Sequence, residues 1–167
     1  VMGGVAHIAA TMTPEGGIRQ LTDMHRLTVG ARDPAHEELA HAFIDLCKQA
    51  PFDSAIASNI DQVLWDKWVF LATLAAMTTL CRGSVGEIVA TPHGKAITIQ
   101  MYEECCQVAK ASGHPIGKDA SVKALEMLTA SGSTFTASML RDLLEGQRTE
   151  HDHILGAMID TGQRMGS

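Results

Sequence analysis

The residue with the clearest chemical potential is Lys67, which lies inside the apolar run LWDKWVFLATLAAMTTL of residues 64–80. Its same-side neighbours on a helix are all apolar: Val63, Leu64, Leu71 and Leu74. Because burying an unpaired ammonium costs several kcal/mol, the position needs an explanation. The side chain could extend to water or pair with Asp61 or Asp66. Alternatively, it lines a cleft in which partial desolvation lowers its pKa and makes it a functional lysine.

Glu150 is the second candidate, because it lies one helical turn before Ile154 on the side of an apolar stripe. That stripe consists of Ile154, Ala157 and Met158. A glutamate in the first turn of a helix can simply interact favourably with the helix dipole. Alternatively, its carboxylate points into the same cleft as Lys67, where the two charges would offset each other's desolvation. They could then serve as a proton donor and its partner.

Ser138 is the third candidate, at the head of the run MLRDLLEGQ. It can be an ordinary N-cap, or its hydroxyl and the free amides of the helix start can bind a substrate carboxylate. The segment EHDH also contains His151 and His153, but side chains two residues apart diverge on a helix. We therefore expect no metal site.

The elements that must position these residues are mostly helices, which begin after Asp33 and Pro34. The first helix has the apolar stripe Leu39, Phe43, Ile44, Leu46 and Cys47. A long helix begins at Asn59 or Asp61 and ends near Cys81, and a short turn follows. Further helices are predicted from Pro92 to about Ser112, from Lys118 or Asp119, from Ser138, and from Thr149, which forms a capping box with Asp152.

The first thirty residues are different in kind. VAHIAATM and HRLTVG are short runs of small or β-branched residues separated by the turn-rich segment TPEGGIRQLTD, which predicts two or three short strands. Such strands bury too little surface to be stable alone. The segment APFDSAIASN is predicted to be a connection. The fold class is therefore a mainly α bundle of about six helices after a short β-rich segment, with a boundary between residues 1–33 and 34–167.

Composition excludes several classes of protein. The net charge is −6, and no basic stripe is present that would bind nucleic acid. The apolar run from Trp68 to Cys81 is short for a bilayer crossing, so a buried core helix is expected. The four cysteines contain no CxxC pair, which is typical of reduced thiols in a cytoplasmic protein. Because the sequence starts without methionine and stops in a helical pattern, we expect a fragment of a longer protein.

Three segments together resemble the C-terminal half of the ketopantoate reductase (2-dehydropantoate 2-reductase) family. They are WDKWVFLATLAAMTTLCRGSVGEI, SGHPI and TASMLRDLLEGQRTEHDHILGAMIDTGQRMG. The leader GGVAHIAATMTPEGGIRQLTDMHRLTVGARD resembles the closing strands of that family's Rossmann-type nucleotide-binding domain. The resemblance implies a helical substrate-binding and dimerisation domain of an NADPH-dependent enzyme that reduces a 2-oxo acid to a 2-hydroxy acid. It further implies that Lys67 is the general acid, Glu150 lies near the substrate hydroxyl, and Ser138 helps to hold the substrate.

The sequence departs from the family pattern in two ways. The best-known members carry asparagines one and two turns after the lysine, where this chain has Leu71 and Ala75, so the substrate is expected to be more apolar or a different ketone. Thr78 is retained, but a bond back to a helix carbonyl is its expected role. No GxGxxG is present, so the NADPH site is expected upstream of residue 1. We therefore expect the chain alone neither to bind NADPH tightly nor to turn over.

A non-catalytic helical module that self-associates is the alternative from a different class. It would use the Met- and Leu-rich helix faces as an interface, and a homodimer fits both interpretations. The direction of Lys67 and Glu150 discriminates between them, since a shared hollow favours the enzyme and opposite faces favour the module. The sequence does not name the substrate.

Overall fold

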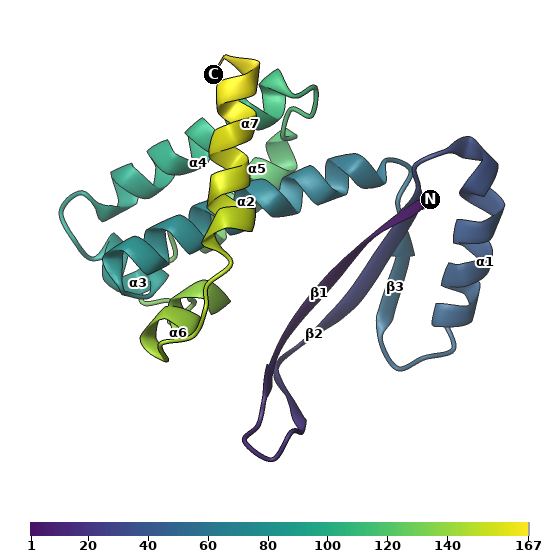
Figure 1. The fold of residues 1–167 in the computed structure, drawn as a ribbon, viewed down its shortest axis with the longest axis horizontal. Coiled ribbons are helices and arrows are strands. Elements are labelled where there is room, and N and C mark those ends of the chain that lie inside the picture. Colours follow the sequence, from purple (N-terminus) through teal and green to yellow (C-terminus); the bar gives the residue numbers. More distant parts are fainter. Residues whose placement is uncertain (167) are drawn as a thin grey trace. The chain divides into compact units, whose positions relative to one another are not determined.

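The computed structural model describes residues 1–166 and divides into two compact units, one of residues 1–64 and a second that begins at Trp65 (Figure 1). The sequence placed the boundary near residue 33 instead. The difference arises because the helix that follows residue 33 packs against the strands and not into the bundle.

The first unit is a three-stranded sheet with one helix. β1 (Met2–Met12) and β2 (Ile18–Ala31) form an antiparallel hairpin, and β3 (Asp53–Ile56) pairs in parallel with β2 on its other side. The helix α1 (Glu37–Cys47) connects the two parallel strands and packs on both. β3 lies in the segment that was predicted to be a connection. That prediction was wrong because a four-residue strand is defined by its pairing with β2, not by its own pattern.

The 3-10 turn that precedes α1 has the predicted Asp33 cap. Asp33 accepts a hydrogen bond from the amide of Ala35 at 2.9 Å, and a single 3-10 turn from Pro34 to His36 leads into the helix. The predicted apolar stripe is only partly correct. The sheet-facing side consists of Ala40, Ile44 and Cys47, whereas Leu39, Phe43 and Leu46 are 56%, 40% and 67% exposed.

α2 (Ile60–Cys81) begins in the first unit. Asn59 caps it, since its side-chain oxygen accepts from the amide of Gln62 at 3.1 Å. Ile60 is 1% exposed and packs so closely on β2 that a β-carbon on Gly30 would lie 2.8 Å from the Cβ of Ile60. Close packing of the helix start on the strand therefore requires glycine at this position.

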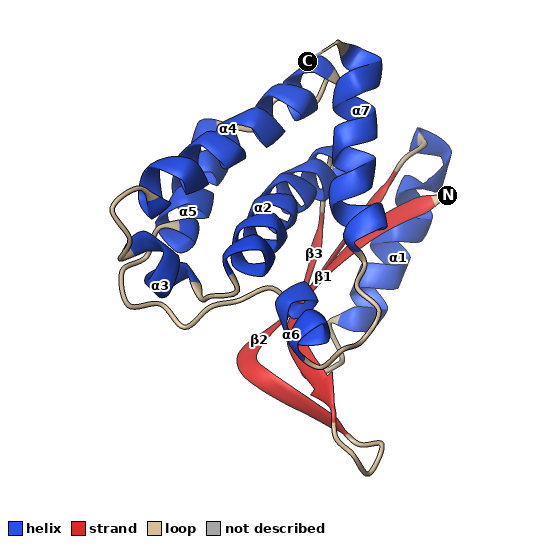
Figure 2. Cartoon of the chain, turned by 60° about the vertical axis from the view of Figure 1, so that its left-hand side comes forward, coloured by secondary structure: helices blue, strands red, loops and turns tan. Residues whose placement is uncertain are grey.

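The second unit is the helical bundle, and it confirms the mainly α fold class. Besides α2 it contains α3 (Val85–Val89), α4 (Gly94–Ala111), α5 (Lys118–Leu128), α6 (Ser138–Leu144), a π-helical segment (Asp152–Gly156) and α7 (Ala157–Met165). The described residues thus form seven α-helices, where about six were predicted. α4 packs against α3, α5 and α7, and the chain from the π segment into α7 crosses α2 (Figures 1 and 2).

α2 supplies the centre of the bundle core. Val69, Ala72, Leu74 and Ala75 are buried in one cluster with residues of α3, α4, α5, α6 and α7. By length and composition alone α2 could also cross a membrane, but a core helix of a globular protein satisfies the same two criteria. Its packing in this cluster supports the prediction of a core helix.

The C-terminus of α2 carries backbone strain that can be relieved. Arg82 has a φ of 50°, and the amide of Gly83 donates to the carbonyl of Thr78 at 3.2 Å, which is the closure of a Schellman motif. A side chain with a β-carbon is disfavoured in the left-handed region. We expect Arg82→Gly to raise the free energy of unfolding by about 1 kcal/mol in urea denaturation. A midpoint that does not rise would show that the arginine side chain compensates for the strain.

Candidate active site

Lys67 lies in the third turn of α2, and its side chain is half-buried. Burial lowers the pKa of its ammonium below the ordinary value. Of the two carboxylates that the sequence offered as partners, Asp61 forms an ion pair with Arg32 at 2.7 Å. Burial of Lys67 therefore disfavours its charged form, which eases release of its proton.

Aromatic rings surround the same turn of α2. The rings of Trp65 and Trp68 are 4.9 Å apart at a tilt of 46°. Trp65 also stacks on the imidazole of His114, with centroids 5.3 Å apart. His114 belongs to the SGHPI loop between α4 and α5. These ring contacts fix the position of both tryptophans.

A hydrogen bond joins the turn of Lys67 to the segment that follows Glu150. The indole Nε1 of Trp68 donates to the carbonyl oxygen of Ile154 at 3.1 Å, and the amide of Ile154 donates to the carbonyl of Glu150 at 3.0 Å. Trp68 directly follows Lys67, and Ile154 lies one helical turn after Glu150. Each bonded residue is therefore close to a predicted catalytic position. The structure thus brings the two backbone segments together. The side chain of Glu150 itself is exposed.

The start of this last helix is not the capping box that the sequence predicted. The hydroxyl of Thr149 pairs with Nδ1 of His151 at 2.8 Å, and the π segment begins after His151 with no side-chain cap. The prediction was wrong because it assumed α-helical spacing from the first turn. In the π segment the amide of Ala157 bonds instead to the carbonyl of Asp152, five residues earlier.

Ser138 is the exposed first residue of α6, and the N-cap is the preceding Ala137, which lacks a capping side chain. The N-cap assignment of Ser138 was therefore wrong by one residue. The amide of Ala137 donates to the hydroxyl of Thr78 at 3.3 Å, and that hydroxyl donates to the carbonyl of Leu74 at 2.7 Å. The predicted back-bond of Thr78 is thus confirmed, and it also anchors the start of α6.

The bond of Trp68 to Ile154 and the bond of Ala137 to Thr78 lie at different heights on α2. Thr78 follows Lys67 by eleven residues, which corresponds to roughly 16 Å along a helix axis. Between them lie the positions that differ from the family pattern. Leu71 is half-buried, whereas Ala75 is 2% exposed and belongs to the hydrophobic core cluster. Both positions are therefore apolar, but only Leu71 is partly accessible.

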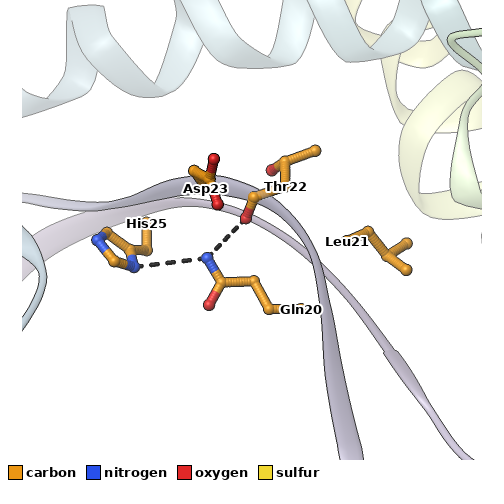
Figure 3. A pocket seen from close by; sticks show the side chains of 5 residues that line it. All are labelled: Gln20, Leu21, Thr22, Asp23 and His25. Carbon is orange, nitrogen blue, oxygen red and sulfur yellow. Dashed lines mark hydrogen bonds between the residues drawn. The ribbon is translucent and has the colours of Figure 1, made fainter.

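Two open hollows on the surface lie away from these candidate residues. One is lined by Gln20, Leu21, Thr22, Asp23 and His25 (Figure 3). It results from a bulge, because β1 pairs Ile8 with His25 and Ala10 with Gln20, leaving four residues of β2 opposite one of β1. A second open hollow lies on α7 and is lined by Ala157, Asp160, Gln163 and Arg164. Neither contains Lys67, Glu150 or Ser138, so their shared cleft stays a prediction.

The turn after β2 does not fit the pyrophosphate of a dinucleotide. In a Rossmann-type unit the pyrophosphate binds at a glycine-rich turn between a strand and the N-terminus of the next helix. The corresponding turn after β2 reads Ala31–Arg32–Asp33–Pro34, and the carboxylate of Asp33 already accepts from the amide there. A carboxylate at this place would repel a phosphate. Nor do residues 1–166 contain three or more His, Cys, Asp or Glu grouped to hold a metal.

Comparison with known proteins gives consistent results. The family model described as "Ketopantoate reductase PanE/ApbA C terminal" matches residues 59–167. An uncharacterized oxidoreductase, YkpB, from Bacillus subtilis is 28% identical over 99% of this chain and 54% of its own length. The 2-dehydropantoate 2-reductase of Archaeoglobus fulgidus is 27% identical over 99% of this chain and 55% of its own length. The chain thus spans about half the length of the curated relatives it matches.

Solved structures show the same fold. The 2-dehydropantoate 2-reductase of Methylococcus capsulatus is 28% identical, with a TM-score of 0.77 over 98% of this chain and 52% of that one. A D-mandelate dehydrogenase in complex with NADH has a TM-score of 0.84 at 17% identity, over 99% and 56%. A dimeric ketopantoate reductase from Staphylococcus aureus has 0.82 at 19%, over 99% and 55%. Since the family model matches well over half of its residues, the chain belongs to the ketopantoate reductase family, as a representative of its C-terminal domain.

Proposed function

We propose that this chain forms the substrate-binding and dimerisation part of an NADPH-dependent reductase that converts a 2-oxo acid into a 2-hydroxy acid. The observation that carries the proposal is the position of Lys67. It is a half-buried lysine with a lowered pKa, in the region matched by the family, and its turn is bonded to the segment after Glu150. Residues 1–64 are proposed to be the closing part of a nucleotide-binding domain, and the helical unit that begins at Trp65 is proposed to be the substrate-binding domain.

The chain's own residues would act on the substrate oxygen and carboxylate. When bound, mainly by segments other than these 167 residues, NADPH would supply a hydride for the keto carbon. As negative charge develops on the keto oxygen, the ammonium of Lys67 donates its proton there and becomes a neutral amine. Glu150 orients that ammonium and favours its reprotonation from solvent. Ser138 holds the substrate.

The substrate is proposed to carry an apolar group next to its keto carbon. A molecule that reaches the ammonium of Lys67 along α2 would meet the half-buried Leu71 one turn further on, where Ala75 is already covered by the core. Neither side chain can form a hydrogen bond, and the hydroxyl of Thr78 is already engaged with two backbone partners. A hydroxyl group placed there would lose its water without a replacement, which costs about 1–3 kcal/mol.

The test uses the full-length enzyme with NADPH and a panel of 2-oxo acids, and follows loss of the nicotinamide absorbance. We expect branched or aromatic 2-oxo acids that lack a hydroxyl on the side chain to exceed ketopantoate in kcat/KM by about tenfold. This is the scale expected for one hydroxyl group left unpaired in the site. The 167-residue chain alone is the control and should show no turnover. Absence of reduction with every 2-oxo acid would contradict the proposed function, and preference for ketopantoate would contradict the apolar site.

We also propose that the full-length protein is a cytoplasmic homodimer. The dimeric Staphylococcus aureus reductase supports this by analogy. The exposed apolar residues Leu39, Phe43 and Leu46 of α1 equally favour the alternative of a self-association module without chemistry. A full-length protein that dimerises but reduces no 2-oxo acid would support that alternative.

A further inference from the structure

We propose that Trp68 is a positioning residue that fixes the backbone of the π segment and, through it, the direction of Glu150 towards Lys67. This inference rests on the proposed function, because it assigns a role within the same site. It follows from one contact between elements 86 residues apart in the sequence, the 3.1 Å hydrogen bond from the indole of Trp68 to the carbonyl of Ile154.

The π segment is the reason that an anchor is needed. A π turn accommodates one extra residue, so residues before it are rotated by about 100° relative to an uninterrupted α-helix. The orientation of Glu150 therefore depends on whether residues 152–156 stay in the π form. Gly156 lies in this segment, and a β-carbon added there would have only ordinary contacts, at 3.9 Å or more. Steric crowding at this glycine thus does not fix the π form.

The indole is well suited to provide the anchor. Trp68 is half-buried and packs against the bundle core, and its ring contacts Trp65, which in turn stacks on His114. A donor held by rigid rings gives a directional bond at little entropic cost. The accepting residue, Ile154, is itself bonded through its amide to the carbonyl of Glu150 at 3.0 Å. Ile154 therefore links the indole of Trp68 directly to the backbone of Glu150.

The test compares two substitutions in the full-length enzyme. Trp68→Phe keeps a ring but removes the N–H donor, and Trp65→Phe is the matched control, because no hydrogen bond from its indole is part of this anchor. We expect Trp68→Phe to lower kcat about tenfold with KM changed less than twofold, and to shift the basic limb of the pH profile of kcat. The control should change kcat by less than threefold.

A double-mutant cycle separates positioning from general damage. Because the effect travels through Glu150, adding Trp68→Phe to Glu150→Gln should change kcat less than twofold. A full tenfold loss in that background would overturn the proposal. If the Lys67→Ala enzyme keeps its activity, the proposed function fails instead. Failure of the Trp68 anchor and failure of the proposed function are thereby distinguishable.

A measurement on the unmodified chain covers the case in which Trp68→Phe does not fold. In the 167-residue protein, the indole proton of Trp68 should exchange with solvent at least tenfold more slowly than that of Trp65. Equal exchange rates of the two indole protons would show that the bond to Ile154 does not persist, and would overturn the anchor.

Discussion

Replacing Lys67 with alanine in the full-length enzyme is expected to lower kcat by about a hundredfold or more, the scale on which a general acid contributes. The reason is that no other group on this face of α2 can donate a proton, since the positions one and two turns further on are Leu71 and Ala75. KM should change much less, because the proton is needed only as charge develops on the oxygen. A loss below about threefold would show that Lys67 is structural.

The pH dependence of the wild-type enzyme provides a second check on the same residue. A general acid must be protonated, so kcat/KM, which reports the free enzyme, should fall as pH rises through the pKa of Lys67. Burial lowers that pKa below 10.5, which places the midpoint of the basic limb below that value. Lys67→Ala should abolish this limb. A fall in activity at high pH that persists in the variant would have to arise from another titrating group.

The same burial predicts an opposite effect on stability. Between the lowered pKa of the folded chain and 10.5, the unfolded chain binds more protons, so the free energy of unfolding rises with pH in that window. At neutral pH, Lys67→Met should therefore stabilise the 167-residue chain by about 1 kcal/mol, a typical gain when a functional charge is removed. Thermal unfolding should show a rise of about 2–4 °C. Destabilisation would indicate that the ammonium contributes to the fold.

Gly94→Ala is expected to destabilise the chain by about 3 kcal/mol, because overpacking at this site is directed against backbone. A β-carbon on Gly94 would lie only 1.7 Å from the carbonyl oxygen of Ile88 and 2.6 Å from the hydroxyl of Thr91. That carbonyl already accepts from the amide of Thr91 at 3.0 Å and from its hydroxyl at 2.8 Å. The start of α4 would have to move away from α3.

Gly156→Ala is the matched control for this substitution. Gly156 has helical torsion angles, and its nearest neighbours to an added β-carbon are at 3.9 Å. The same change should therefore stabilise by about 0.5–1 kcal/mol through the entropy of the unfolded chain. Urea denaturation of both variants measures the contrast. Equal effects at the two positions would contradict the packing of α4 on α3.

Much of the bundle could be predicted from the sequence, because the signals that start and stop its helices are local. Asp33 and Asn59 cap their helices as expected, and α2 ends at Cys81. Which face of each helix is buried was less predictable. In α4, the large apolar residue Ile97 is 51% exposed, while Gly94, Thr98 and Ala109 are buried. Small residues permit closer approach between helices, and a pattern of large apolar residues does not reveal which ones are used.

The candidate site divides in the same way. An apolar run with one lysine, and a serine and a glutamate twelve residues apart near the C-terminus, are visible in the sequence. The bond between Trp68 and Ile154 is not, because its donor and acceptor lie 86 residues apart and the acceptor is a backbone carbonyl, which every residue possesses.

The sequence by itself determined the kinds of residues at the site and most helix boundaries, since both depend on side chains within a few positions of each other. Only the tertiary structure decided that β3 joins the sheet, that α1 packs on the strands, and that the last helix begins with a π turn. Each of these choices differs little in local energy from its alternative. Contacts made with distant segments therefore select among them.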